Sequence, residues 1–433
     1  MSVARSLVWL LVSVFGVTAA LAQVPLAEVA PLARARAERS RPAQQKKLEP
    51  YWSDLSLNYR INSQHLDTKI PEVAALGDSV VPLLLEKLQP SQAGEAARDL
   101  AGNCRRVLER LDPASFLDAL VELANGTHDV ARSEAIRLLG CAQGPQAITV
   151  LVDLLDRTNG EDKRLVVRSL RLLKATSAGP KVVTMLASAD RQVRDDVLTF
   201  LVAAKPAQVL DTVIQALANE KVPDLLPSYV EYFAQAVRAS DAAARALLPL
   251  LDRERLDWQA SKRLVQALAT VAPLEHEPTV RRLQQALDGD DTSSLEVQAA
   301  VTLRALGDKQ GVIRLKRTFE EQIRKRRKEP ALFEQRANLE FAVEEYADAL
   351  ADFEKALEFS DGMAMTRRAY VGQMRCEARR KKVQNLTRLM KSSGLTVAEI
   401  EAIGQEDAVL QEALQQDKVR AFLQALAKEQ APK

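Results

Sequence analysis

The chain has 433 residues, of which 47% are hydrophobic and 27% are charged, and this balance excludes an intrinsically disordered protein. The formal net charge of +2 excludes a global electrostatic attraction to nucleic acid. Aromatic residues make up only 4% of the chain and glycine is sparse, which favours a helical fold over a β-rich one.

The N-terminal 22 residues have the pattern of a secretory signal peptide. Arg5 supplies a positive charge, residues 6–17 are mostly apolar, and an Ala-Leu-Ala cleavage sequence ends at Ala22. The apolar run is short for a membrane span, which needs about 20 residues, although an uncleaved anchor remains the alternative. We therefore expect a periplasmic or secreted protein whose mature chain begins at Gln23.

A linker and entry segment is expected over residues 23–66. As far as about Pro50 it contains four prolines and many alanines, and it carries basic residues at positions 34, 36, 39, 41, 46 and 47. A solvated tether is one interpretation. The other is contact of segment 34–47 with a membrane or an anionic envelope polymer, because a basic residue near an anionic surface contributes roughly 1 kcal/mol of binding.

Residues 67–318 are predicted to form helix pairs, and residues 127–155 show the unit most clearly. Its first helix has apolar residues at i, i+4, i+7 and i+8, as on one helical face: Ala131, Ala135, Leu138 and Leu139. Gly140 follows as a C-cap suited to positive φ, and Pro145 suits the first position of a second helix. The second helix has its own apolar face: Ile148, Leu151, Leu154 and Leu155.

The unit recurs along the chain. Val193 begins the same spacing over residues 193–201, and Arg194 follows it as Arg132 follows Ala131. The units resemble HEAT-like repeats, the short variety also seen in phycobilisome-lyase-type proteins, and residues 131–140, 193–201 and 303–308 carry the resemblance. It implies an all-α fold, an α-solenoid of stacked helix pairs, because an isolated pair cannot bury its apolar surface.

Residues 319–433 have a different signature. Residues 346–357 read Tyr-Ala-Asp-Ala-Leu-Ala-Asp-Phe-Glu-Lys-Ala-Leu, and with Ala337 they resemble a tetratricopeptide repeat. Small residues such as Ala349 would let its two helices approach closely. Glu340 departs from the pattern, where a large aromatic is usual, and so does Asp361, where proline is usual. Residues 370–391 resemble a degenerate second copy, followed by capping helices.

No residue pattern points to catalysis, a cofactor or a metal site. His65, His128 and His276 lack Cys, Asp or Glu partners at ligand spacing on one helix face, and His128 is expected to start a helix. Cys104 and Cys141 are either a disulfide between neighbouring repeats or small buried residues. The basic runs at 324–328 and 379–382 read as solvated helix ends, and we expect no nucleic acid partner.

We therefore expect an exported, non-enzymatic scaffold that binds an unidentified protein partner through a concave solenoid surface. The groove-facing positions of the tetratricopeptide-like module are Glu334, Asn338, Phe341 and Ala342. Their mixture does not match the Lys- and Asn-rich clamp that holds a C-terminal carboxylate. Two alternatives stay open: an accessory lyase-type protein acting on a prosthetic group, and an adaptor bound to an anionic envelope surface through segment 34–47.

Overall fold

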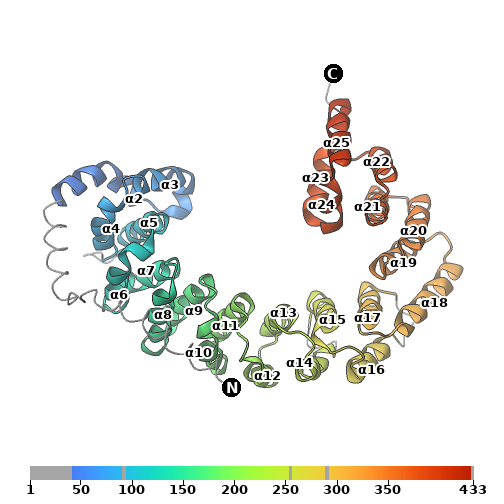
Figure 1. Ribbon diagram of the computed structural model, residues 1–433, viewed down its shortest axis with the longest axis horizontal. Coiled ribbons are helices and arrows are strands. Elements are labelled where there is room, and N and C mark those ends of the chain that lie inside the picture. Colours follow the sequence, from blue (N-terminus) through green and yellow to red (C-terminus); the bar gives the residue numbers. More distant parts are fainter. Residues whose placement is uncertain (1–40, 90–93, 253–255, 288–291, 431–433) are drawn as a thin grey trace, which may run out of the picture. The chain divides into compact units, whose positions relative to one another are not determined.

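The computed structural model describes residues 41–89, 94–252, 256–287 and 292–430, and every regular element in these ranges is a helix (Figure 1). The predicted all-α class is therefore confirmed. The chain divides into two compact units, one up to Ala175 and one from Thr176. The expected signal peptide lies outside the described residues. Among those that are described, no helix combines the length and the apolarity that a membrane span requires.

The first unit is a stack of helix pairs. Its α-helices are α2 (Trp52–Leu55), α3 (Tyr59–Ala74), α4 (Val81–Lys87), α5 (Glu95–Arg110), α6 (Leu117–Ala124), α7 (Asp129–Leu139), α8 (Pro145–Arg157) and α9 (Gly160–Leu172). Short 3-10 turns are η1 (Glu49–Tyr51), η2 (Asp78–Val80) and η3 (Pro113–Phe116). The first helices α3, α5, α7 and α9 pack on one another in sequence, and each of α4, α6 and α8 packs on a first helix of the row.

The packed structure begins earlier than the sequence indicated. Residues 41–48 are helical, and Leu48, Leu55 and Leu66 are completely buried although all three lie in the expected linker and entry segment. Arg41 donates to the carboxylate of Glu86 at 2.8 and 2.9 Å. The described part of segment 34–47 is therefore packed against the helical array rather than a free tether, because apolar side chains anchor its helix.

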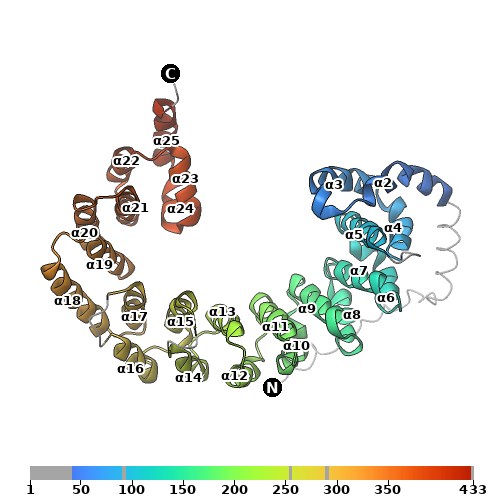
Figure 2. The ribbon, with the colours of Figure 1, turned by 180° about the vertical axis from the view of Figure 1, so that it is seen from behind.

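The second unit continues the same architecture. Its α-helices are α10 (Gly179–Val182), α11 (Arg191–Ala204), α12 (Leu210–Asn219), α13 (Leu226–Ala236), α14 (Asp241–Leu247), α15 (Trp258–Val271), α16 (Glu277–Ala286), α17 (Ser294–Ala305), α18 (Gln310–Lys325), α19 (Pro330–Ala342), α20 (Tyr346–Glu358), α21 (Met363–Arg379), α22 (Val383–Ser392), α23 (Val397–Glu406), α24 (Ala408–Leu414) and α25 (Asp417–Gln430). Its 3-10 turns are η4 (Thr176–Ala178), η5 (Val183–Ala187), η6 (Pro223–Leu225) and η7 (Leu248–Leu251). The first helices α11, α13, α15, α17, α19 and α21 pack in succession, and Figure 2 shows this row from behind.

Gly140 has a different role from the one predicted. Its φ of −66° is ordinary helical geometry, so no positive φ is required there. A Cβ at Gly140 would instead lie 2.8 Å from the Cβ of Ser169, on α9. Glycine is needed because α7 and α9 approach closely, whereas Pro145 does begin α8 as predicted.

Buried hydroxyl groups fix neighbouring first helices to each other. The Ser169 hydroxyl on α9 donates to the carbonyl of Ile136 on α7 at 2.8 Å. In the second unit, the Thr302 hydroxyl on α17 donates to the carbonyl of Val265 on α15 at 2.9 Å. Each bond satisfies a buried polar group and joins two consecutive helix pairs.

Residues 319–430, where a tetratricopeptide-like module was expected, belong to the same compact unit as the helices before them. Both α17 and α18 pack on α19, so close packing crosses the boundary expected between residues 318 and 319. Ala337, Ala349 and Ala356 are completely buried where the helices meet. The final helices α22 to α25 enclose a further apolar cluster that includes Leu386, Met390 and Leu423.

Candidate functional site

The four predicted partner-binding residues lie along α19, beside α21. The carboxylate of Glu334 accepts from the Arg368 guanidinium at 2.7 and 3.1 Å. The Phe341 ring lies 4.4 Å from the guanidinium carbon of Arg375. Because Arg368 and Arg375 both belong to α21, the two contacts tie one helix to the other.

Asn338 lies between these contacts on α19. Its side chain is half-buried, and within the described residues it makes no hydrogen bond. Phe341 also packs edge-on against Tyr346, with ring centroids 5.3 Å apart, whereas Ala342 is exposed. We call Glu334, Asn338, Phe341, Arg368 and Arg375 the α19–α21 seam. Phe341 is covered by its neighbours, so the seam offers the Asn338 amide rather than an open aromatic pocket.

Glu340, the departure from the tetratricopeptide pattern, is part of a buried ion-pair network. Its side chain is only 7% exposed, and its Oε1 lies 3.1 Å from the Nζ of Lys316 on α18. Lys316 also pairs with Glu345. Burial raises the pKa of Glu340 to about 6, although Lys316 acts in the opposite direction. The ion pair fixes α18 to α19, which explains a charge where an aromatic was expected.

The same network brings three carboxylates together. Ligand oxygens of Glu340, Glu345 and Asp348 lie within 4.8 Å of one another. Oxygen clusters of this kind suit hard cations such as Ca²⁺. The Lys316 ammonium pairs with two of the three carboxylates, Glu340 and Glu345, and balances part of their charge. The sequence did not indicate this network, because Lys316 lies on a different helix from the carboxylates.

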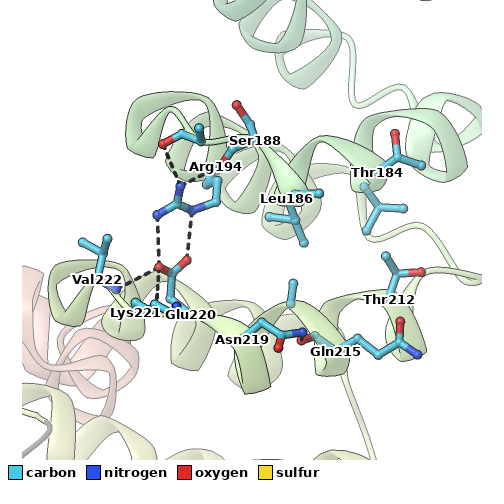
Figure 3. A pocket seen from close by; sticks show the side chains of 14 residues that line it. Thr184, Leu186, Ser188, Arg194, Thr212, Gln215, Asn219, Glu220, Lys221 and Val222 are labelled. Atoms are coloured by element: carbon cyan, nitrogen blue, oxygen red, sulfur yellow. Dashed lines mark hydrogen bonds and ion pairs between the residues drawn. The ribbon is translucent and has the colours of Figure 1, made fainter.

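A pocket of about 610 Å³ opens between η5 and α12 (Figure 3). At one end, Arg194 donates to both carboxylate oxygens of Glu220 at 3.0 Å and to the carbonyl of Ser188 at 2.8 Å. Burial alone would raise the pKa of Glu220, but hydrogen bonds from Arg194 and from the Val222 N–H hold it below its usual value. Apart from Lys221, the remaining polar lining is neutral: Thr184, Ser188, Thr212, Gln215 and Asn219. Arg194 and Glu220 thus already have hydrogen-bond partners within the chain. The pocket residues form no nucleophile–base pair.

Arg132 and Arg194 occupy equivalent positions in the repeated sequence pattern, and their side chains make similar contacts. Each donates to a carbonyl six residues earlier, that of Gly126 and that of Ser188. Each also reaches an acidic residue beyond the following helix, Asp162 for Arg132 and Glu220 for Arg194. Arg132 therefore joins α7 to α9 of the next helix pair, whereas Arg194 joins α11 to the end of α12.

The histidines and cysteines have structural environments. His128 caps α7 by accepting from the Ala131 N–H at 3.3 Å, as predicted for a helix start. His276 is buried, and its ring contacts Asp241 at 2.9 Å and Thr279 at 2.7 Å. Cys104 and Cys141 are free thiols. Burial raises the pKa of the Cys104 thiol to about 12, which makes it unreactive.

No family model and no curated protein matches this chain. Among solved structures, an engineered protein from the Northeast Structural Genomics Consortium is similar at 18% sequence identity and a TM-score of 0.36. The match covers 80% of this chain and 98% of the engineered one. The helical-repeat architecture rests on the stacking of helix pairs described above.

Proposed function

We propose that this chain is an exported, non-enzymatic scaffold that binds an extended segment of a protein partner along the α19–α21 seam. The observation that supports this most is Asn338, whose amide has no partner within the described residues and lies between two contacts that join α19 to α21. A side-chain amide offers both donors and an acceptor, so it can pair with a peptide backbone in both directions.

The rigidity of the seam favours this function. Arg368 and Arg375 hold α19 and α21 together before any partner arrives, so binding does not require the two helices to be ordered. Such preorganisation leaves more of the interaction energy for affinity. The exposed Ala342 at the end of the seam adds a small surface on which a partner side chain can lie.

A photo-crosslinking amino acid placed at Asn338 tests this proposal in the full-length chain. It is expected to trap a specific partner in the envelope fraction of the native cell. The control places the same group at Gln384, an exposed residue on α22. A partner trapped equally at both positions, or only at Gln384, would show that the seam is not the binding surface.

Export is a separate part of the proposal, and the Ala-Leu-Ala sequence that ends at Ala22 supports it. N-terminal sequencing of the protein recovered from the periplasm or medium should give Gln23 as the first residue. Recovery of a chain that still begins with Met1, in the membrane fraction, would indicate an uncleaved anchor instead.

A further inference from the structure

The turn between α19 and α20 brings three acidic residues to one place. The Glu345 N–H donates to the carbonyl of Glu340 at 2.8 Å, and the Glu344 N–H donates to that of Phe341 at 3.1 Å. Glu344 lies between the two helices with a positive φ of 68°, so the two bonds form a Schellman motif. This motif fixes the backbone of Glu345 beside Glu340, and Asp348 follows in the first turn of α20.

Two other turns of the chain have leucine where Glu340 stands. The carbonyls of Leu170 at the end of α9 and Leu303 near the end of α17 accept the equivalent backbone bond, and both side chains are completely buried. A carboxylate in such a position costs free energy unless neighbouring groups balance its charge and satisfy its oxygens. The Oε2 of Glu340 is buried, and no donor among the described residues reaches it.

The charges at this turn do not balance. Three carboxylates each offer an oxygen, and these oxygens lie within 4.8 Å of one another. Lys316 pairs with two of them, those of Glu340 and Glu345. The nearby Arg336 guanidinium is bound to Asp352 and balances that carboxylate instead. The cluster therefore keeps a negative charge that a divalent cation would balance.

The next helix pair provides an internal comparison. Glu377 on α21 is the counterpart of Glu340, because its carbonyl accepts the Lys382 N–H at 2.9 Å in the same kind of turn. Its side chain is also buried, with one oxygen that no described donor reaches. Its Oε1, however, accepts from Arg380 at 3.1 Å and from Asn385 at 3.2 Å. This second turn supplies cations and an amide where the first supplies two further carboxylates, so only the first attracts a cation.

We propose that the carboxylates of Glu340, Glu345 and Asp348 bind a Ca²⁺ ion. Carboxylate oxygens are preferred ligands of this hard cation, and two oxygens on one Ca²⁺ ion lie up to about 5 Å apart, because each Ca–O distance is about 2.3–2.6 Å. The spread of the cluster falls within that limit. Glu345 is half-buried and Asp348 is exposed, so water can complete the coordination from the solvent side. The ion would hold the end of α19 to the start of α20, beside Phe341 of the seam.

Titration of the full-length mature chain with CaCl₂, after treatment with EDTA and removal of the chelator, tests this proposal. Isothermal titration calorimetry should show one saturable site with a dissociation constant of about 10⁻⁴–10⁻³ M, the range of extracellular calcium modules. MgCl₂ should bind more weakly, because Mg²⁺ demands shorter ligand distances and loses its water reluctantly. CaCl₂ should also raise the unfolding midpoint, since the cluster exists only in the folded chain.

Three variants locate the site. Asp348→Asn should weaken calcium binding by roughly tenfold or more, because it removes one of the three charged ligands. Lys316→Gln should tighten binding, because it removes the ammonium that competes with calcium for Glu340 and Glu345. The control, Glu354→Gln, removes an exposed carboxylate of α20 that lies outside the cluster, and it should leave the affinity unchanged.

Asp348 is exposed, so Asp348→Asn should melt like the parent chain in EDTA, and its loss of affinity then reports on the ligand rather than on folding. Absence of saturable calcium binding to the parent chain would overturn the proposal and leave Lys316 and protons to neutralise the cluster. Equal weakening by Asp348→Asn and Glu354→Gln would reduce the binding to general attraction by surface carboxylates and would also overturn it. Equal or tighter binding of Mg²⁺ would overturn the assignment to calcium.

Discussion

At the scale of single residues, burial decides what an ion pair contributes. The Arg194 and Glu220 side chains are only 11% and 3% exposed, so removal of one partner leaves the other charged and buried. Glu220→Ala should therefore lower the free energy of unfolding by about 3–5 kcal/mol. Asp417→Ala, which breaks the exposed Arg420–Asp417 pair, should cost less than about 1 kcal/mol. Urea denaturation of both variants measures the difference, and equal losses would contradict it.

Glu340 should make stability depend on pH. The pKa of Glu340 in the folded chain, about 6, lies above the ordinary value of 4.5. The stability that its protonated form contributes is therefore fully present below pH 4.5 and is lost as the pH rises through 6. Glu340→Gln cannot titrate. Between pH 4.5 and 6.5, the parent chain should therefore lose roughly 2 kcal/mol of stability relative to this variant.

Urea denaturation at several pH values across this window measures the difference. The comparison between the two chains cancels the titrating groups that do not interact with Glu340. A stability difference that stays constant with pH would mean that Glu340 keeps an ordinary pKa through its contact with Lys316.

At the scale of elements, the α19–α20 pair depends on a small residue. Ala349 is completely buried in a cluster with Ala337, Phe353 and Cys376. Ala349→Trp should push the two helices apart and cost about 1–3 kcal/mol or more. Ala347→Trp, on the exposed face of the same helix, should have little effect.

Hydrogen exchange should locate the damage caused by Ala349→Trp. Amides of α19, α20 and the adjoining α21 should exchange early, whereas those of α11 and α13 should keep their protection, because each helix pair contacts only its neighbours. Early exchange that extends to α11 would show that the second unit unfolds as one cooperative block.

Features that depend only on residues close together in the sequence could be predicted from it. Pro145 at the start of α8 and His128 as the cap of α7 follow from short-range backbone chemistry. The reason for Gly140 could not be predicted, because its close neighbour Ser169 belongs to the next first helix. The Glu340–Lys316 pair was missed for the same reason. In the candidate site, the sequence indicated the α19 positions, but the covering of Phe341 by Arg375 depends on how α21 packs.

At the scale of the whole molecule, the C-terminal helices should stabilise the helices before them. Ile323 on α18 packs against the cluster of Phe333, Ala356 and Ala369. Removal of residues 330–433 should leave a folded chain with a lower unfolding midpoint, because Ile323 and Lys316 lose their partners. Thermal unfolding followed by circular dichroism checks this, and an unchanged midpoint would show that the two parts contribute independently.

The hydroxyl bonds from Ser169 to Ile136 and from Thr302 to Val265 also restrict how such a chain can evolve. Shifting a helix along its axis by one residue turns it by about 100°, which would move the hydroxyl away from its carbonyl and leave a buried polar group without a bond. Insertions or deletions of one or two residues within these helices should therefore be selected against. Gain or loss of a complete helix pair keeps every such bond in register, so the chain can lengthen or shorten by duplication or deletion of whole units.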